Sequence, residues 1–114
     1  MIPDKKRKAY VMKGFVDMRK QINGLAKIVQ DAMPDGSFLG SYFMFMGKTR
    51  RTMKILYWDH SGFCLWQKRL EEERFPWPAA GEGLTPVVHY MLLLALEGAD
   101  PWKAHRKLSY TYVA

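Results

Sequence analysis

Three β-prone runs separated by two short polar turns occupy the middle of the chain, and they constrain the fold more than any other feature. Aromatic and β-branched residues dominate the runs at 42–46, 52–58 and 63–69, which is the composition of strands. The turns are Gly-Lys-Thr-Arg-Arg at 47–51 and Asp-His-Ser-Gly at 59–62, residue types that favour tight reversals. Because consecutive strands with short loops usually pair directly, we expect an antiparallel meander.

A helix is predicted between a short strand at 10–12 and the meander. Asp17 has the side chain of an N-cap residue, and the Pro34-Asp35-Gly36 segment ends the element. This placement puts Arg19 and Lys20 in the first turn. The buried stripe is expected from apolar residues at helical spacing, namely Ile22, Leu25, Ala26, Val29, Ala32 and Met33.

A further strand at 74–77 and a second helix at 85–96 are predicted beyond the meander. Thr85 is a suitable cap for that helix, and Pro86 stands at its first position, where a missing N–H costs little. The sequence therefore predicts an α+β fold, an antiparallel meander of about four to five strands with two main helices packed on it.

Length and composition predict a single domain over residues 1–114. The lysine-rich segment 1–8 is expected to be a flexible basic arm, and 103–114 a basic tail whose order the sequence does not define. The single cysteine, Cys64, excludes an internal disulfide and favours a cytoplasmic setting. The longest apolar run, 90–96, is too short to cross a membrane.

The whole chain has a net formal charge of +7, and its positive charge is concentrated in the first half. Residues 1–57 hold 12 Lys and Arg against 4 Asp and Glu, whereas residues 58–114 hold 6 against 7. Such an asymmetry is typical of a surface that binds a polyanion. A basic surface that only aids solubility is the alternative.

The first turn of the meander concentrates this charge in Lys48, Arg50, Arg51 and Lys54. A hairpin projects such side chains away from the core, where arginine can bind phosphate oxygens or a guanine edge. The alternative is an exposed cationic turn without a ligand. These four residues are the principal nucleic-acid-binding candidates.

Two further pairs of basic residues are candidates. Cations are slightly disfavoured in the first turn of a helix, so Arg19 and Lys20 there suggest a phosphate near the helix start; two solvated side chains are the alternative. Lys68 and Arg69 follow each other on a strand and point to opposite faces, so at most one of them shares a face with a given groove.

Signs of enzymatic chemistry are missing from the sequence. The three histidines have no metal-ligand spacing with Cys64 or the acids, and neither a phosphate-binding loop nor a nucleophile elbow occurs. Asp59 is most simply a turn residue. We therefore expect no catalytic residue, cofactor, metal or small-molecule substrate. Base stacking is a minor alternative to core packing for the aromatic residues Tyr57, Trp58, Phe63, Trp66, Phe75 and Trp77.

Several ordered motifs resemble the accessory proteins of the insertion-sequence sixty-six family of bacterial transposable elements, often described as TnpB-type or second-reading-frame proteins. They are Asp17-Met18-Arg19-Lys20, Lys54-Ile55-Leu56-Tyr57-Trp58-Asp59, Gly62-Phe63, Lys68-Arg69-Leu70-Glu71, Phe75-Pro76-Trp77-Pro78 and Leu96-Glu97-Gly98-Ala99-Asp100. The turn before Gly62 departs from the family pattern, which more often has a second glycine, and the lysine-rich start and basic tail are additions.

The resemblance implies a non-catalytic accessory protein for transposition, since the catalytic transposase of that family is a separate polypeptide. Expected partners are DNA at the element ends, the transposase and other element-encoded proteins. An adaptor that binds the transposase without touching DNA is the alternative, favoured by the acidic run 71–73 and the very apolar predicted last helix. A small nuclease using Asp59 is a weaker one.

Overall fold

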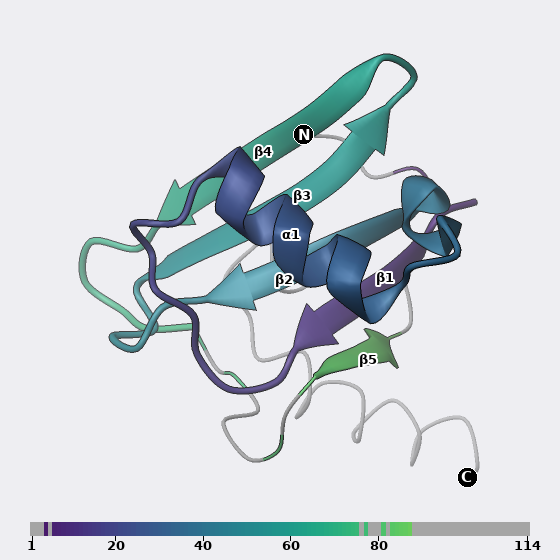
Figure 1. Ribbon diagram of the computed structural model, residues 1–114. Coiled ribbons are helices and arrows are strands. Elements are labelled where there is room, and N and C mark those ends of the chain that lie inside the picture. Colours follow the sequence, from purple (N-terminus) through teal and green to yellow (C-terminus); the bar gives the residue numbers. More distant parts are fainter. Residues whose placement is uncertain (1–3, 5, 76, 78–80, 82, 88–114) are drawn as a thin grey trace, which may run out of the picture.

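The structure is a computed structural model that describes residues 4, 6–75, 77, 81 and 83–87. Five strands form one sheet with α1 lying across one of its faces (Figure 1). The elements are β1 (Lys8–Met12), α1 (Ile22–Ala32), the 3-10 helix η1 (Ser37–Gly40), β2 (Ser41–Met46), β3 (Thr52–Asp59), β4 (Gly62–Arg69) and β5 (Leu84–Val87). An α+β fold is therefore present, with α1 as the single α-helix of the described part.

The sheet is mixed, and the prediction of a purely antiparallel sheet is wrong. Its strand order is β4-β3-β2-β1-β5, and β1 runs parallel to β2 from Lys8↔Ser41 to Val11↔Met44. The reason is the connection between them: α1 crosses over the sheet and returns the chain to the end at which β1 began. The predicted hairpins β2–β3 and β3–β4 are confirmed as antiparallel.

Two predicted elements after the meander are corrected. Arg74, Phe75 and Trp77 are not in a strand; the two aromatic side chains fill the core instead. The start of the second predicted helix is strand β5, which pairs antiparallel with β1 through Tyr10↔Pro86. Proline is tolerated there because β5 is an edge strand. The remainder of that helix, 88–96, and the basic tail lie outside the described residues.

Apolar side chains are buried on both faces of the sheet. On one face, Leu25, Ala26 and Val29 of α1 pack against Phe43, Phe45 and Leu56. On the other, Phe75 and Trp77 join side chains from β1, β2 and β3, including Val11, Met44 and Ile55. Each large apolar side chain buried in this way contributes roughly 1.5–3 kcal/mol. This core fixes the strand ends, and hence the surface at those ends.

Candidate nucleic-acid interface

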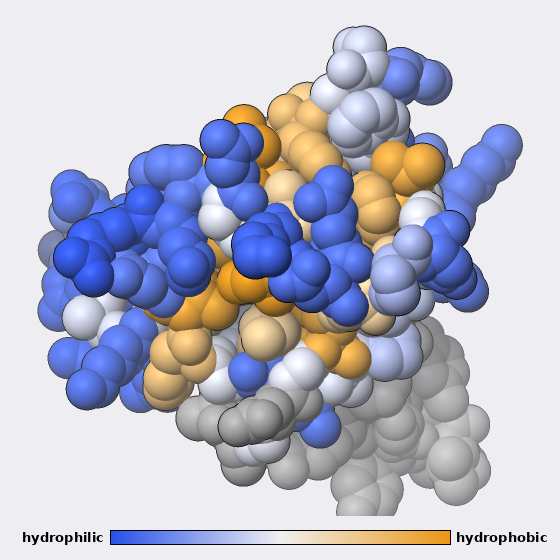
Figure 2. Space-filling model, viewed as in Figure 1, coloured by the Kyte–Doolittle hydropathy of each residue, from blue (hydrophilic) through white to orange (hydrophobic). Residues whose placement is uncertain are grey.

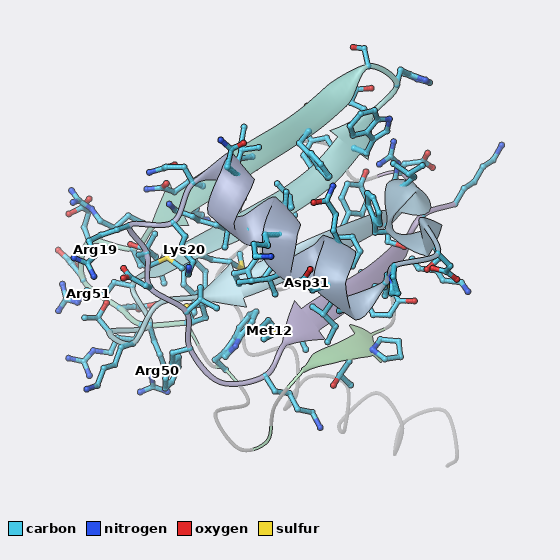
Figure 3. All side chains as sticks on the ribbon, in the orientation of Figure 1. Met12, Arg19, Lys20, Asp31, Arg50 and Arg51 are labelled. Atoms are coloured by element: carbon cyan, nitrogen blue, oxygen red, sulfur yellow. The ribbon has the colours of Figure 1, made fainter. Side chains whose placement is uncertain are left out.

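Basic side chains from three segments meet at one end of the sheet. The β2–β3 turn lies at this end, β4 finishes there, and the connection from β1 to α1 passes over it. Figure 3 shows Arg19, Lys20, Arg50 and Arg51 on the same side of the molecule, and Figure 2 shows hydrophilic surface gathered there. We call this surface the basic end; it consists of Arg19, Lys20, Lys48, Arg50, Arg51, Lys68 and Arg69.

The backbone of the β2–β3 turn is held at two of its three basic positions. The N–H of Leu70 donates to the Arg51 carbonyl at 2.7 Å, and the N–H of Phe75 donates to the Arg50 carbonyl, also at 2.7 Å. Arg50 has a positive φ of 59°. Lys48 and Arg51 are exposed and Arg50 is half-buried. The turn thus presents cations on a fixed backbone.

Lys54 does not belong to this exposed surface, and the expectation that the hairpin projects it into solvent is wrong. Only 1% of the surface of Lys54 is exposed. The Nζ donates to the carbonyls of Met18 at 2.9 Å and Lys20 at 2.8 Å. Burial lowers the pKa of Lys54 below its ordinary value. Lys54 faces α1 because it alternates with Met53 and Ile55, which occupy the opposite face.

Arg19 and Lys20 precede the helix, so their predicted position in its first turn is wrong. Helix α1 starts at Ile22 with Gln21 as its N-cap residue. Asp17 instead closes a local turn: its carboxylate accepts the Arg19 N–H at 2.9 Å and forms an ion pair with the Arg19 guanidinium at 2.7 Å. Asp side chains often bind a backbone N–H two residues on in this way, in competition with helix formation.

This ion pair predicts a pH dependence of the turn. The side chain and N–H of Arg19 lower the pKa of Asp17 from 3.8 to about 2. Because the pKa of Asp17 is lower in the folded protein, the ion pair stabilises the fold fully when the pH is above the ordinary value of 3.8. This stabilisation is lost as the pH falls from 3.8 through about 2. An NMR titration of the Asp17 carboxyl should show this midpoint, and Arg19→Gln should move it back toward 3.8. An unshifted midpoint in the wild type would contradict the contact.

Gly47 allows the Asp17–Lys20 turn to lie directly on the β2–β3 turn. A Cβ at Gly47 would lie 2.5 Å from Cγ of Met18. Because Lys54 holds the backbone carbonyl of Met18, the Met18 side chain cannot move freely away from a Cβ at position 47. We expect Gly47→Ala to lower the free energy of unfolding by about 1–3 kcal/mol, measured with urea. The matched control is Gly40→Ala, whose Cβ meets nothing within 4 Å; equal midpoints for both variants would contradict the packing.

Lys68 and Arg69 are the last two residues of β4, where they pair with Met53 and Thr52 of β3. They fall on opposite faces of the sheet, as side-chain alternation predicts. Arg69 is exposed and forms an ion pair with Glu71 at 3.1 Å, and Arg51 donates to the Glu71 carbonyl at 3.1 Å. The Glu71 carboxylate therefore offsets part of the charge at this edge of the basic end.

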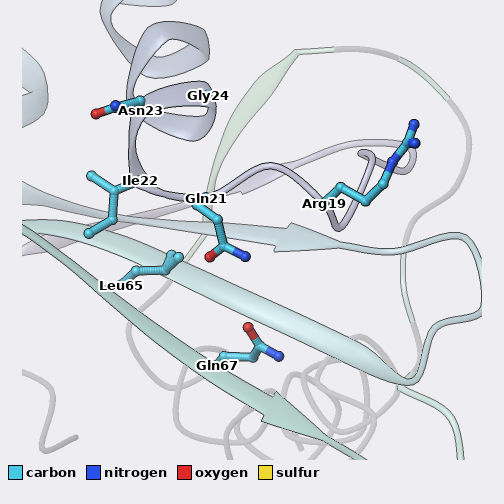
Figure 4. A pocket seen from close by; sticks show the side chains of 7 residues that line it. All are labelled: Arg19, Gln21, Ile22, Asn23, Gly24, Leu65 and Gln67. Carbon is cyan, nitrogen blue, oxygen red and sulfur yellow. The ribbon is translucent and has the colours of Figure 1, made fainter.

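An open pocket of about 520 Å³ adjoins the basic end, between the start of α1 and β4. Figure 4 shows the side chains of Gln21 and Gln67 extending into it, whereas the Arg19 guanidinium is directed away. The sequence reasoning missed both glutamines. Strand alternation could have indicated Gln67, since it shares a face with Arg69 two residues later. The pocket is lined by Arg19, Gln21, Ile22, Asn23, Gly24, Leu65 and Gln67.

The aromatic residues considered for base stacking are distributed away from the basic end or inside the core. Phe75 and Trp77 are buried. Trp58 and Phe63 contact each other edge to face beside the β3–β4 turn, at the opposite end of the sheet. Tyr57 packs against Tyr42, and Trp66 packs against the core of the face remote from α1. Five of the six residues belong to the two core clusters or pack against them, whereas Trp58 is half-buried.

Metal-binding clusters and membrane-spanning helices are absent from the described ranges. No group of three or more His, Cys, Asp or Glu side chains gathers there closely enough to hold a metal ion. Within the same ranges, no helix combines the length and apolar character needed to cross a membrane.

The fold and the basic end define a small, basic α+β protein, and comparisons with known proteins place it in a family. The model of the family described as IS66 Orf2 like protein matches residues 7–106. Over 96 residues the chain is 32% identical to the uncharacterized protein y4hO of Sinorhizobium fredii (strain NBRC 101917 / NGR234), covering 84% of this chain and 83% of that protein. Over 92 residues it is also 32% identical to the uncharacterized protein y4jC of the same strain, covering 81% and 79%. No solved structure matches the chain significantly.

The chain belongs to the IS66 Orf2-like protein family. The resemblance inferred from its motifs is therefore confirmed. Membership of a family defined by a reading frame of an insertion element indicates a role that accompanies transposition.

Proposed function

We propose that the chain is a non-catalytic accessory protein of transposition that contacts DNA phosphates through its basic end. The observation that carries the proposal is the convergence of cations from three separate segments on one end of the sheet. Phosphate contacts of this kind supply affinity and orientation without reading sequence. The candidate contacts are Arg19, Lys20, Lys48, Arg50, Arg51 and one of Lys68 and Arg69, which lie on opposite faces of the sheet. Lys54 is assigned to the interior.

The fixed backbone supports this function. Lys54 holds two carbonyls of the Asp17–Lys20 turn, and the N–H groups of Leu70 and Phe75 hold the β2–β3 turn. Cations presented on such a scaffold lose less conformational freedom on binding than cations on a loose tail, which favours affinity.

An adaptor that binds the transposase is the second candidate. It is favoured by the exposed acidic run of Glu71, Glu72 and Glu73, which lies directly after β4 and beside the basic end. Alternating acidic and basic patches suit a protein partner better than a continuous phosphate backbone.

A photo-crosslinking amino acid at position 48 separates the two functions. The modified protein is mixed with an element-end duplex and the transposase together, and the crosslinked species are identified. The DNA contact predicts a protein–DNA crosslink from position 48 and none from position 27, which lies exposed on α1. A crosslink from position 48 to the transposase alone would replace the DNA contact with the adaptor.

A further inference from the structure

The outer edge of β4 is open in the described part of the chain. β4 stands at the end of the strand order and pairs only with β3. Figure 1 shows it as an outermost strand, with none of the described segments lying along its outer side. A strand edge of this kind presents N–H and C=O groups that can pair with another strand.

One hydrogen bond determines which backbone groups of β4 point outward. The N–H of Leu70 donates to the Arg51 carbonyl, which extends the β3–β4 register by one pair. Because hydrogen-bonded positions alternate along an antiparallel pair, every second residue of β4 directs its backbone groups away from β3. These outward residues are Phe63, Leu65, Gln67 and Arg69.

Most of the strand, residues 62–67, lacks the features that normally block an open edge. Natural edge strands are often protected by charged side chains, a proline or a bulge. Residues 62–67 contain neither a charge nor a proline, and the pairing with β3 runs without interruption from Asp59↔Gly62 to Thr52↔Arg69. Half-buried apolar side chains flank the edge on both faces, with Phe63 and Leu65 on the α1 side and Trp66 on the other.

We propose that this edge pairs antiparallel with β4 of a second copy of the chain. Both charges of the strand, Lys68 and Arg69, lie at one end, so parallel pairing would set like charges side by side. Antiparallel pairing instead carries Arg69 toward the β3–β4 turn of the other copy, where the Asp59 side chain is 58% exposed. A two-fold axis also keeps both α1 helices on one face, so that Phe63 and Leu65 meet their counterparts.

The pairing has a consequence that rests on the proposed function. Antiparallel strands point in opposite directions, so the two basic ends would lie at opposite ends of the joined sheet. A pair of chains would then hold two DNA segments, one at each basic end. The pairing itself requires no DNA.

The test is the mass of the nuclease-treated, DNA-free protein by analytical ultracentrifugation over a range of concentrations. Gln67→Pro removes an outward N–H from an exposed residue and leaves the hydrogen bonds to β3 in place. The matched variant Gln67→Thr keeps the N–H. We expect a dimer for the wild type and for Gln67→Thr, and a monomer with an unchanged circular dichroism spectrum for Gln67→Pro.

Hydrogen exchange of the wild type gives a second readout that does not depend on folding of the proline variant. We expect the amides of Leu65 and Gln67 to become protected as concentration rises, while that of Trp66, which faces β3, stays unchanged. A wild-type monomer at all concentrations, or concentration-independent exchange at Leu65 and Gln67, would overturn the proposal. So would a dimer that persists in folded Gln67→Pro. Each of these results would leave the DNA contact standing, because none involves DNA.

Discussion

Neutralising the β2–β3 turn with Lys48→Gln, Arg50→Asn and Arg51→Gln should weaken duplex binding by about two orders of magnitude at about 0.1 M salt. Each phosphate contact contributes about −0.9 to the log–log salt slope, so three lost contacts reduce the slope by about 2.7. Asparagine is chosen at position 50 because it tolerates the positive φ of that residue. Fluorescence anisotropy with a labelled duplex measures both quantities.

A charge-matched variant shows whether position or total charge is responsible. Lys6, Lys8 and Lys27 are exposed and lie away from the basic end. Replacing all three with glutamine removes the same formal charge as the turn variant. We expect this control to retain most of the affinity and nearly all of the salt slope. Equal losses in the two variants would mean that net charge, and not the basic end, governs binding.

Truncating Lys54 should cost about 3 kcal/mol of unfolding free energy in Lys54→Ala. The change removes a buried aliphatic stem, which leaves a cavity, and takes the charged donor away from the carbonyls of Met18 and Lys20. Lys54→Met keeps most of the stem and avoids burying a charge, so it should cost less, about 1 kcal/mol. Urea unfolding of both variants measures the two losses.

The same variants report on the basic end. Without the ammonium group of Lys54, the Asp17–Lys20 turn loses the hydrogen bonds to its Met18 and Lys20 carbonyls. Arg19 and Lys20 should therefore lose order and contribute less to DNA binding. A Lys54→Ala stability within about 0.5 kcal/mol of the wild type, the range of ordinary surface substitutions, would show that Lys54 is not the internal anchor assigned to it.

The hairpins were predictable from sequence because their signals are local. Aromatic and β-branched runs with Gly, Asp and Ser between them define β2, β3 and β4 almost to the residue. The exposure of Lys48 and Arg51 follows from the same turn. The parallel pairing of β1 with β2 was not predictable in this way, because it depends on how α1 packs across the sheet.

Lys54 illustrates how a pattern of apolar neighbours can be misread. The run Met53 to Trp58 is apolar at successive positions apart from Lys54, which is typical of a strand buried on both faces. A lysine within such a strand has no solvent-facing side. Its burial was therefore indicated by its neighbours. The carbonyls that accept its hydrogen bonds could not be identified in this way, because they belong to a turn far away in sequence.

Pro86 was ambiguous for a different reason. A proline is tolerated at the first position of a helix and on an edge strand because neither position needs its N–H. Thr85-Pro86 therefore fits both structures. Pairing with β1 decides between them, and that contact joins residues far apart in the sequence.

The most direct measurement of the central proposal is binding of the wild-type protein to an element-end duplex and to a scrambled duplex across a salt series. Contacts from Lys20, Lys48, Arg50 and Arg51 alone predict a log–log slope of about −3.6, at about −0.9 for each phosphate. Arg19 and Arg69 are not counted because they are already paired with Asp17 and Glu71, and a contact from Lys68 would make the slope steeper. Tighter binding to the true end would add sequence recognition to this phosphate contact. No binding at low salt, or a slope near zero, would contradict the DNA function and leave the adaptor in its place.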